Sequence, residues 1–526
     1  NTADGKDVTL GGASNLLNPN NRTIYSDSTS GTIDTFDNVA NATTLEVNSD
    51  AVDNLKKWVK GFDVKNTEDP TTSRFYMGDP LHSEPVVITY GGTLADPDST
   101  IYFGSNEGFV HAIDTEDGNE EFSFLPQELH RIQNINYEDN TPAGSRPYGM
   151  DGPITSWMYD LNNNNVIYSE DNSLDTDEHV YLYAGMRRGG RSYYGLNVTN
   201  RDNPQLLFKI QGGTTGFEKL GQTWSKMTVA KVLFNGSPRF VLFFAGGYDT
   251  NQDSNDTSEA DTLGNAIYMV DASTGDLLWR ASNDEESNYL EIPQMVNSIP
   301  ASLAAVDITG EGYVDYLFAA DTGGRVFRID INQANTGSSN FAKGGMIASI
   351  AGSDEAGNRR FYNKPNVALV KNKQKGDYLT ISIGSGYRAH PLNEAIEDRF
   401  YLIKDLNPYS APATYNVKTE APTTKTTLDL ENEEPADSNK LYNVSSLMLN
   451  GKSSLTESMS KLLEDGGGWY ITFSNTGEKV LSESTTFSEA VIFTTFSPST
   501  GTRVGCGGDT GQSRTYALNQ NNAMAI

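Results

Sequence analysis

The pattern of apolar and polar positions is clearest in residues 101–126, where short apolar runs alternate with polar turns. Residues 101–103 (IYF) and 109–113 (FVHAI) are rich in β-branched and aromatic side chains. Each run is followed by a turn that contains glycine, which can adopt the positive φ angles of tight turns. Two strand–turn–strand units in so short a stretch predict one antiparallel meander, which is most of a propeller blade.

The same pattern returns later in the chain. Residues 266–279 (AIYMVDASTGDLLW) repeat its second half, and residues 316–331 (YLFAADTGGRVFRIDI) repeat its first half. Residues 180–198 and 490–519 are looser copies at irregular spacing. A meander repeated with long insertions predicts an all-β chain, a modified β-propeller with long inserted loops and a few short helices. A row of separate β domains is the alternative.

The polar stretches suggest where the domain begins and where it is interrupted. Residues 1–50 are rich in Asn, Asp, Thr and Ser without an apolar rhythm, which predicts an extended lead-in. Residues 51–526 are then expected to form a single propeller domain, with a polar and partly helical insertion at residues 408–465. A short helix is expected over residues 51–59, ended by Gly61, and another over residues 453–463.

Composition narrows the class of protein. The chain has 39 Lys and Arg against 69 Asp and Glu, a net charge of −30. Such a charge repels nucleic acid and anionic membrane surfaces, so no nucleic-acid partner is expected. Cys506 is the single cysteine, so no disulfide can form within the chain. No apolar run approaches the about 18–20 residues of a membrane-spanning helix. The first twenty residues resemble no signal peptide, so we expect a trimmed or partial form of an exported protein.

The clearest chemical motif is residues 306–316, VDITGEGYVDY. Asp307, Thr309, Glu311 and Asp315 occupy positions 1, 3, 5 and 9 of a loop, and the main-chain carbonyl of Tyr313 falls at position 7. Alternating oxygen donors in a tight loop suit Ca²⁺, which takes 6–8 oxygen ligands. The loop is shorter than an EF-hand and has no glutamate at position 12. We expect Ca²⁺ at these five residues; a solvated acidic turn is the alternative.

Other candidate features favour structural roles. The acidic stretch 249–256 is interpreted as a solvated loop, and residues 187–191 (RRGGR) as a hairpin turn rather than an anion site. His82 is interpreted as a structural hydrogen-bonding residue. The sequence contains no G-x-S-x-G, H-E-x-x-H or P-loop motif. No catalytic residue is therefore predicted, and we expect no enzymatic activity.

Several short motifs occur in a recognisable order. They are GDPLHS (78–83), YFGSNEG (102–108), HAID (111–114), RGG (188–190), YYGL (193–196), GGYD (246–249), VDASTG (270–275), DTGG (321–324), GSGYR (384–388), GWY (468–470) and GE (477–478). In these motifs the chain resembles the C-terminal propeller domain of the PilC/PilY family of type IV pilus tip-associated proteins. The resemblance covers about residues 50–520.

The resemblance implies a propeller of about seven blades with an inserted calcium loop. It implies a role in pilus biogenesis, retraction control, surface adhesion and twitching motility, with calcium as a regulator. The implied partners are major or minor type IV pilins at the pilus tip and an unidentified host or abiotic surface ligand. The implied location is the cell surface, the pilus tip or the outer membrane. Thr309 and Glu311 depart from the usual Asp or Asn of such loops, and no Arg-Gly-Asp triplet occurs.

Two other classes remain. The repeats also resemble those of pyrroloquinoline-quinone-dependent dehydrogenases, which share a propeller fold and the use of calcium. Those enzymes usually close most blades with tryptophan, whereas only Trp279 occupies that place here, and a vicinal disulfide needs a second cysteine. A non-catalytic propeller scaffold is the third possibility.

Overall fold

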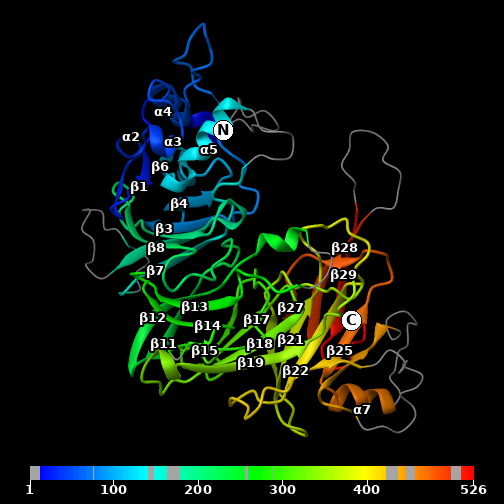
Figure 1. Ribbon diagram of the computed structural model, residues 1–526. Coiled ribbons are helices and arrows are strands. Elements are labelled where there is room, and N and C mark those ends of the chain that lie inside the picture. The colour runs from blue at the N-terminus through cyan, green and yellow to red at the C-terminus, as the bar shows by residue number, and fades with distance from the viewer. Residues whose placement is uncertain are drawn as a thin grey trace. The chain divides into compact units, whose positions relative to one another are not determined.

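A computed structural model of the chain describes residues 12–498 and 511–526, except 75, 140–146, 163–166, 168–177, 255–258, 287, 422–435 and 446–456. These residues divide into two compact units. Unit 1 is Asn1–Phe217, Gln222–Val229 and Ala272–Asp276; unit 2 is Glu218–Gly221, Ala230–Asp271 and Leu277–Ile526. Figure 1 shows that both are built mainly of strands. The predicted domain boundaries stay a prediction.

The first meander has the strands that its sequence predicts. The run 101–103 lies in β4 (Asp96–Gly104), and the run 109–113 lies mostly in β5 (Val110–Asp114). Tyr102 and Ala112 are register partners on these antiparallel strands. The apolar pattern therefore predicted these two strands correctly. It is the pattern expected of a strand, because successive side chains of a strand point to opposite faces. This four-stranded sheet, β3 to β6, is called blade 1.

Unit 1 contains blade 1 and blade 2, the latter formed by β7 to β10 in the order β10-β9-β8-β7. Its other strands are β1 (Ile24–Asp27), β2 (Ile33–Thr35), β3 (Val86–Thr93), β6 (Glu120–Phe124), β7 (Ile154–Tyr159), β8 (His179–Gly185), β9 (Ser192–Asn197) and β10 (Gln205–Gln211). Its helices are α1 (Ala13–Leu16), α2 (Phe36–Val39), α3 (Ala42–Leu45), α4 (Val52–Lys60), α5 (His130–Glu138) and the 3₁₀ turns η2 (Gln127–Leu129) and η3 (Arg187–Gly189).

The N-terminal segment differs from the extended lead-in that its composition predicts. Residues 24–45 form β1, β2, α2 and α3, and β1 pairs in parallel with β6 at the edge of blade 1. Ile24, Phe36 and Leu45 are buried in the core of unit 1. Each apolar residue is carried by a different short element, so the sequence shows no period although the segment packs.

The first predicted helix is confirmed. α4 buries Leu55 and Val59, and it ends at Gly61, whose φ of 110° is in the left-handed region that favours glycine. The predicted second helix overlaps α7 (Glu457–Asp465). Of the insertion predicted at residues 408–465, residues 422–435 and 446–456 lie outside the described part. Among the described residues, no helix has the length and apolar content to cross a bilayer.

Unit 2 holds most of blade 3 (β11 to β14), blade 4 (β16 to β19), blade 5 (β20, β21, β22 and β25) and a further sheet of β26 to β29. Its first strands are β11 (Thr228–Phe234), β12 (Ser237–Ala245), β13 (Ala266–Asp271), β14 (Leu277–Ser282), β15 (Leu290–Glu291), β16 (Ala304–Val306), β17 (Tyr316–Ala320), β18 (Arg325–Ile331) and β19 (Ala342–Ser349). The others are β20 (Asn366–Val370), β21 (Tyr378–Gly384), β22 (Arg399–Asp405), β23 (Thr419–Glu420), β24 (Lys440–Asn443), β25 (Gly468–Thr472), β26 (Lys479–Val480), β27 (Thr485–Phe487), β28 (Ala490–Ser497) and β29 (Gln512–Asn519). The 3₁₀ turns η4 (Thr250–Asp253) and η5 (Ser338–Asn340) lie between strands.

The all-β propeller class is confirmed, whereas the number of about seven blades is not. The described residues form five four-stranded blades. In the further sheet, β26 and β27 both pair with β28 on one side and β29 pairs on the other, so it is no regular four-stranded meander. The expected number came from the resemblance alone, because irregular spacing of the repeats does not count blades.

Added strands or bridges cover several outer blade edges. β1 and β2 extend blade 1, and β15 pairs in parallel with β14 of blade 3. Lys418 bridges to Ala348 of β19 in blade 4, and β24 with β23 extends blade 5 from β25. These additions satisfy backbone N–H and C=O groups that an open edge would leave unpaired.

Candidate functional site

The predicted calcium loop connects β16 and β17 of blade 4. These strands pair as an antiparallel hairpin that closes with Val306 opposite Tyr316. Gly310 and Gly312 have φ values of 76° and 84°, and a Cβ atom at either would meet nothing within 4 Å. The two glycines are thus needed for backbone conformation rather than for space. They turn several N–H groups of the loop inward.

Asp307 accepts those N–H groups. Its Oδ1 lies 2.7 Å from the nitrogen of Gly310 and 3.3 Å from that of Glu311, and its Oδ2 lies 2.7 Å from the nitrogen of Gly312. Desolvation alone would raise the pKa of Asp307, but the bonds from Gly312 and Gly310 lower it from its usual value. The carboxylate is therefore held ionised, because hydrogen bonds to the charged form favour that form.

Asp315 closes the other end of the loop. Its Oδ2 accepts the N–H groups of Ile308 at 2.9 Å and of Thr309 at 3.3 Å. The Thr309 hydroxyl lies 3.2 Å from Oδ1 of Asp307 and 3.4 Å from Oδ2 of Asp315. Two carboxylates and one hydroxyl thus converge, as a hard cation requires of its ligands.

The other two predicted ligands are Glu311 and the main-chain carbonyl of Tyr313. Glu311 is exposed, and the ring of Tyr313 faces Lys231, whose Nζ lies 5.2 Å from the ring centroid. In the described part of the chain, no three His, Cys, Asp or Glu side chains lie close enough to hold a metal. Asp307, Thr309 and Asp315 fit calcium by donor type; Glu311 and the Tyr313 carbonyl stay a prediction.

In the acidic stretch 249–256, two carboxylates accept hydrogen bonds from neighbouring parts of the chain. Oδ2 of Asp249 accepts the N–H groups of Thr262 and Leu263, both at 3.0 Å. Asp253 accepts the Tyr248 hydroxyl at 2.8 Å. Asp256 lies outside the described residues. These bonds hold the segment in place within unit 2. The interpretation as a solvated loop is therefore wrong for Asp249, which is buried.

Two motifs that the sequence left separate come together in unit 1. Nδ1 of His82 lies 2.9 Å from both carboxylate oxygens of Asp151, and Arg187 donates to Oδ2 of Asp151 at 3.2 Å. The Arg187 guanidinium also lies 3.9 Å from the ring centroid of Trp224. Arg187 has a φ of 49°, a strained value for a side chain of this size. The cluster supports structural roles for His82 and the 187–191 turn, whereas Asp151 carried no recognisable signal.

A triad-like arrangement lies inside blade 1. The hydroxyl of Ser105 lies 3.0 Å from Nε2 of His111, and Nδ1 of His111 lies 2.7 Å from Glu120. Such spacing is that of a nucleophile, base and orienting acid. Ser105 and His111 are both fully buried, however, and the ring of Phe109 lies 5.5 Å from the imidazole. No substrate reaches this hydroxyl in the folded chain, so the arrangement serves packing.

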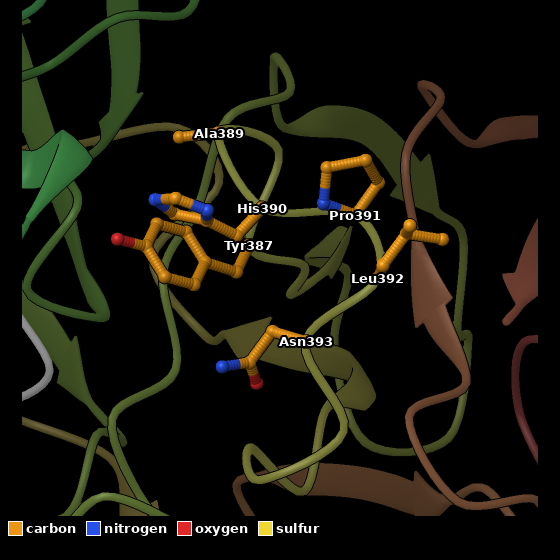
Figure 2. A pocket seen from close by; sticks show the side chains of 6 residues that line it. All are labelled: Tyr387, Ala389, His390, Pro391, Leu392 and Asn393. Carbon is orange, nitrogen blue, oxygen red and sulfur yellow. The ribbon is translucent and has the colours of Figure 1, made fainter.

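One open pocket of about 430 Å³ lies on unit 2 and is lined by a single loop (Figure 2). The loop, residues 385–398, joins β21 to β22, and Ser385 donates to Asp398 at its base at 2.7 Å. The Tyr387 hydroxyl donates to the carbonyl of Gln252 at 2.7 Å, which fixes the middle of the loop. The length of the connection between β21 and β22 is a feature of the sequence that could have indicated this pocket.

Comparison with known proteins places these observations in a family. A family model described as the PilY1 beta-propeller domain matches residues 71–368. The type IV pilus biogenesis factor PilY1 of Pseudomonas aeruginosa strain UCBPP-PA14 is 26% identical over 283 residues, which are 48% of this chain and 21% of that protein. A PilY1 homologue of Xylella fastidiosa strain Temecula1 is 25% identical over 287 residues, 49% of this chain and 17% of that protein. The chain spans about a fifth of the length of these relatives.

A solved structure agrees with the sequence relatives. The crystal structure of the C-terminal domain of Pseudomonas aeruginosa PilY1 matches with a TM-score of 0.51 and 19% sequence identity. The match covers 81% of this chain and 79% of that one. At this sequence identity, the similarity of the two structures establishes the fold of this chain and nothing beyond it.

Proposed function

The chain belongs to the PilY1 β-propeller family, and from this premise we propose that it is the propeller of an exported factor for type IV pilus biogenesis. The family match over residues 71–368 carries the proposal. We place the protein at the cell surface, at the pilus tip or the outer membrane. Its partners in this proposal are type IV pilins, and through a surface ligand it supports adhesion and twitching motility.

The proposed role is binding and regulation rather than catalysis. The Ser105–His111–Glu120 arrangement is enclosed by blade 1, which argues against nucleophilic chemistry there. The pocket of loop 385–398 is lined by Ala389, Pro391 and Leu392 beside polar groups, a surface suited to contact with a ligand.

Calcium is the proposed regulator. Asp307, Thr309 and Asp315 would hold the ion, with Glu311 and the Tyr313 carbonyl as the further predicted ligands. Bound calcium would supply positive charge between two carboxylates that otherwise repel each other. The Asp307 and Asp315 side chains already order the loop through its N–H groups, so the chain's own contribution is a preformed turn. In this proposal calcium controls retraction of the pilus.

A complementation experiment tests the pilus role. In the source bacterium, the gene for the full-length protein is deleted and replaced either by the complete gene or by one lacking residues 71–368. We expect surface pili and twitching to return only with the complete gene. A variant with Arg239→Met, at an exposed ion pair with Asp271, is the control and should restore both. Normal piliation and twitching without residues 71–368 would refute the proposal.

A further inference from the structure

The loop that follows β18 contacts both the calcium loop of blade 4 and the first strand of blade 3. Gln333, two residues beyond the end of β18, donates from Nε2 to the carbonyl of Val314 at 2.8 Å. Its Oε1 accepts the N–H of Leu233, in β11, at 3.2 Å. Val314 is the residue before Asp315 in the calcium loop. One side chain therefore joins that loop to another blade.

Further backbone groups of β11 and of the turn after it are bonded to the same part of blade 4. The carbonyl of Lys231 accepts the N–H of Val314 at 3.0 Å. The carbonyl of Leu233 accepts from Nδ2 of Asn335 at 2.7 Å, and Oδ1 of Asn335 accepts the N–H of Asn235 at 2.7 Å. Lys231 and Leu233 are two positions apart on one strand, so their backbone groups point to the same side. On its other side β11 neighbours β12. These bonds join blade 3 to blade 4 within unit 2.

The peptide unit between Tyr313 and Val314 links a predicted calcium ligand to β11. Its N–H donates to the carbonyl of Lys231, and its oxygen is the main-chain ligand predicted at position 7 of the loop. In a planar trans peptide unit, as this one is, the C=O and N–H groups point in opposite directions. The hydrogen bond to β11 therefore directs the Tyr313 oxygen away from β11. Contact with blade 3 thus sets the direction of this predicted ligand.

The next peptide unit, between Val314 and Asp315, is held at both of its polar groups. Its carbonyl accepts from Gln333, and its N–H donates to the carbonyl of Val306 at 2.8 Å. The carbonyl of Asp315 accepts the N–H of Ile331 at 2.8 Å, which fixes the backbone on the other side of the carboxylate. The position of the Asp315 carboxylate therefore depends on Gln333, a residue outside the loop.

We propose that Gln333 is a positioning residue for calcium, which holds Val314 and Asp315 in place and couples the calcium loop to β11 of blade 3. The inference rests on the calcium site proposed above and adds a residue and a second blade to it. The coupling is reciprocal, because two sites that affect each other's binding do so by the same factor. A fixed β11 favours calcium binding, and β11 becomes less mobile when the site is filled.

A glutamine suits this position because its one amide group both donates and accepts hydrogen bonds. Nε2 of Gln333 meets a carbonyl and Oε1 meets an N–H, so each end of the amide has the partner it requires. Methionine is also unbranched and flexible but has no amide. Gln333→Met therefore removes both bonds while it keeps a long side chain in the same place. Gln374→Met, at an exposed glutamine of unit 2, is the matched control.

The test uses the complete 526-residue chain, with calcium chloride as the probe. Isothermal titration calorimetry, well below the melting temperature, gives the Kd for calcium, and melting in EDTA gives the stability without metal. We expect Gln333→Met to weaken calcium binding about fivefold or more, which is the lower end of the usual coupling between two sites. Gln374→Met should leave the Kd unchanged. If Gln333→Met lowers the melting temperature in EDTA but leaves the Kd unchanged, Gln333 is only structural and the inference is overturned.

Hydrogen exchange of the unchanged chain gives a second result, which holds even if Gln333→Met does not fold. With calcium we expect the amides of Leu233 and Val314 to exchange about fivefold or more slowly, because opening of this contact is coupled to the site. Amides of β21 in blade 5 report general stabilisation and should slow less. Equal slowing at β21, or no change at Leu233 although calcium binds, would overturn the inference alone. An unchanged chain that binds no calcium would instead refute the calcium site itself, and the positioning role with it.

Discussion

Asp307 and Asp315 show how single residues prepare the calcium loop. Each carboxylate accepts N–H groups of its own loop, so each is oriented without a metal. Thr309 lies between them and contacts both. A hydroxyl in place of a carboxylate lowers the negative charge of the site, and we expect an affinity weaker than the sensor range of roughly 10⁻⁷–10⁻⁵ M.

Removing Asp315 should separate a calcium site from an acidic turn. Calcium that binds only the folded chain stabilises it by about 2.7 kcal/mol at a concentration of a hundred times Kd. We expect millimolar calcium to raise the melting temperature, and Asp315→Ala to abolish most of the rise. Asp276→Ala removes an exposed acid outside the loop, in unit 1, and should keep the rise. Equal shifts for the two variants would leave the loop as an acidic turn.

His130 illustrates a residue whose burial makes the chain sensitive to acid. Desolvation, followed by repulsion from Lys56, lowers the pKa of His130 to about 3. Its ring nitrogens contact Ser26 at 2.8 Å and Thr44 at 3.1 Å. The folded pKa lies below the unfolded value, so the unfolded chain binds more protons between pH 6.5 and 3. Stability is therefore complete above that range and falls as the pH drops.

Replacing His130 should reduce this sensitivity. At pH 5 the cost is about 2 kcal/mol, from about 1.4 kcal/mol for each pH unit below 6.5. His130→Gln keeps a donor and an acceptor but does not titrate. We expect its melting temperature to fall less between pH 7.5 and 5 than that of the unchanged chain. The same fall in both would show that His130 is not the cause.

At the scale of elements, a buried charge network joins β18 of blade 4 to β22 of blade 5 and to the connection that follows β22. Arg328 of β18 donates to Asp330 at 2.6 Å and to Asp405 at 2.7 Å, and also to the carbonyls of Asn407 and Ser410. All three charged side chains are nearly inaccessible. Breaking such a network is costly because it leaves charges buried without partners.

The Arg328 network gives an element-scale prediction. Arg328→Met should lower the free energy of unfolding of unit 2 by about 3–5 kcal/mol. Arg239→Met, at an exposed pair with Asp271, should change it by less than about 1 kcal/mol. Urea titration followed by tryptophan fluorescence measures both, since Trp279 and Trp469 of unit 2 are fully buried. Similar effects of the two substitutions would contradict a structural role for the network.

The elements that the sequence predicted are those with a visible period. β17 and β18 coincide with the repeat over residues 316–331, and α4 with its predicted amphipathic face. β1 and β2 were not predictable, because pairing with β6 depends on residues about a hundred positions away. The number of blades was not predictable either, since β26 and β27 share one side of β28.

The candidate site was predictable in part for a related reason. Spacing located Asp307, Thr309 and Asp315 in one turn, because ligands within a short loop are set by local geometry. The contact of His82 with Arg187 depends on the tertiary fold and left no local signal. The same holds for Ser105 and His111, whose triad-like spacing became interpretable only with their burial.

At the scale of the whole molecule, the two units should respond to acid in opposite directions. In unit 1, burial lowers the pKa of His111. Burial alone would raise the pKa of Glu120, but Arg22 and His111 together outweigh it and lower that pKa to about 2. Both groups, like His130, lose their contribution as the pH falls. In unit 2, burial raises the pKa of Asp321 and of Asp398 to about 6 each. In the unfolded chain the pKa of each carboxyl is lower, so the folded chain binds more protons in this range. The two groups therefore stabilise the folded state increasingly as the pH falls from 6 towards 4.

Hydrogen exchange read separately for each unit tests this contrast. Between pH 7.5 and 5, after correction for intrinsic rates, we expect protection to fall in the strands of blades 1 and 2. Protection in blades 4 and 5 should hold or rise. Asp398→Asn, which cannot titrate, should remove part of the rise in unit 2 while leaving unit 1 unchanged. A uniform loss of protection across both units would contradict the prediction.

The strand that extends blade 1 also has a consequence for how fast the chain folds. Ser26 of β1 donates to the carbonyl of Leu125, 99 residues further along. The chain between β1 and Leu125 must close, at a cost in entropy, before these favourable contacts can form. Chains dominated by distant contacts therefore fold slowly. Blade 1 therefore spends its early lifetime with an open edge beside β6, during which it is prone to aggregation. In a chain that emerges N-terminus first, β1 is present early, but its pairing must wait until β6 and Leu125 have emerged.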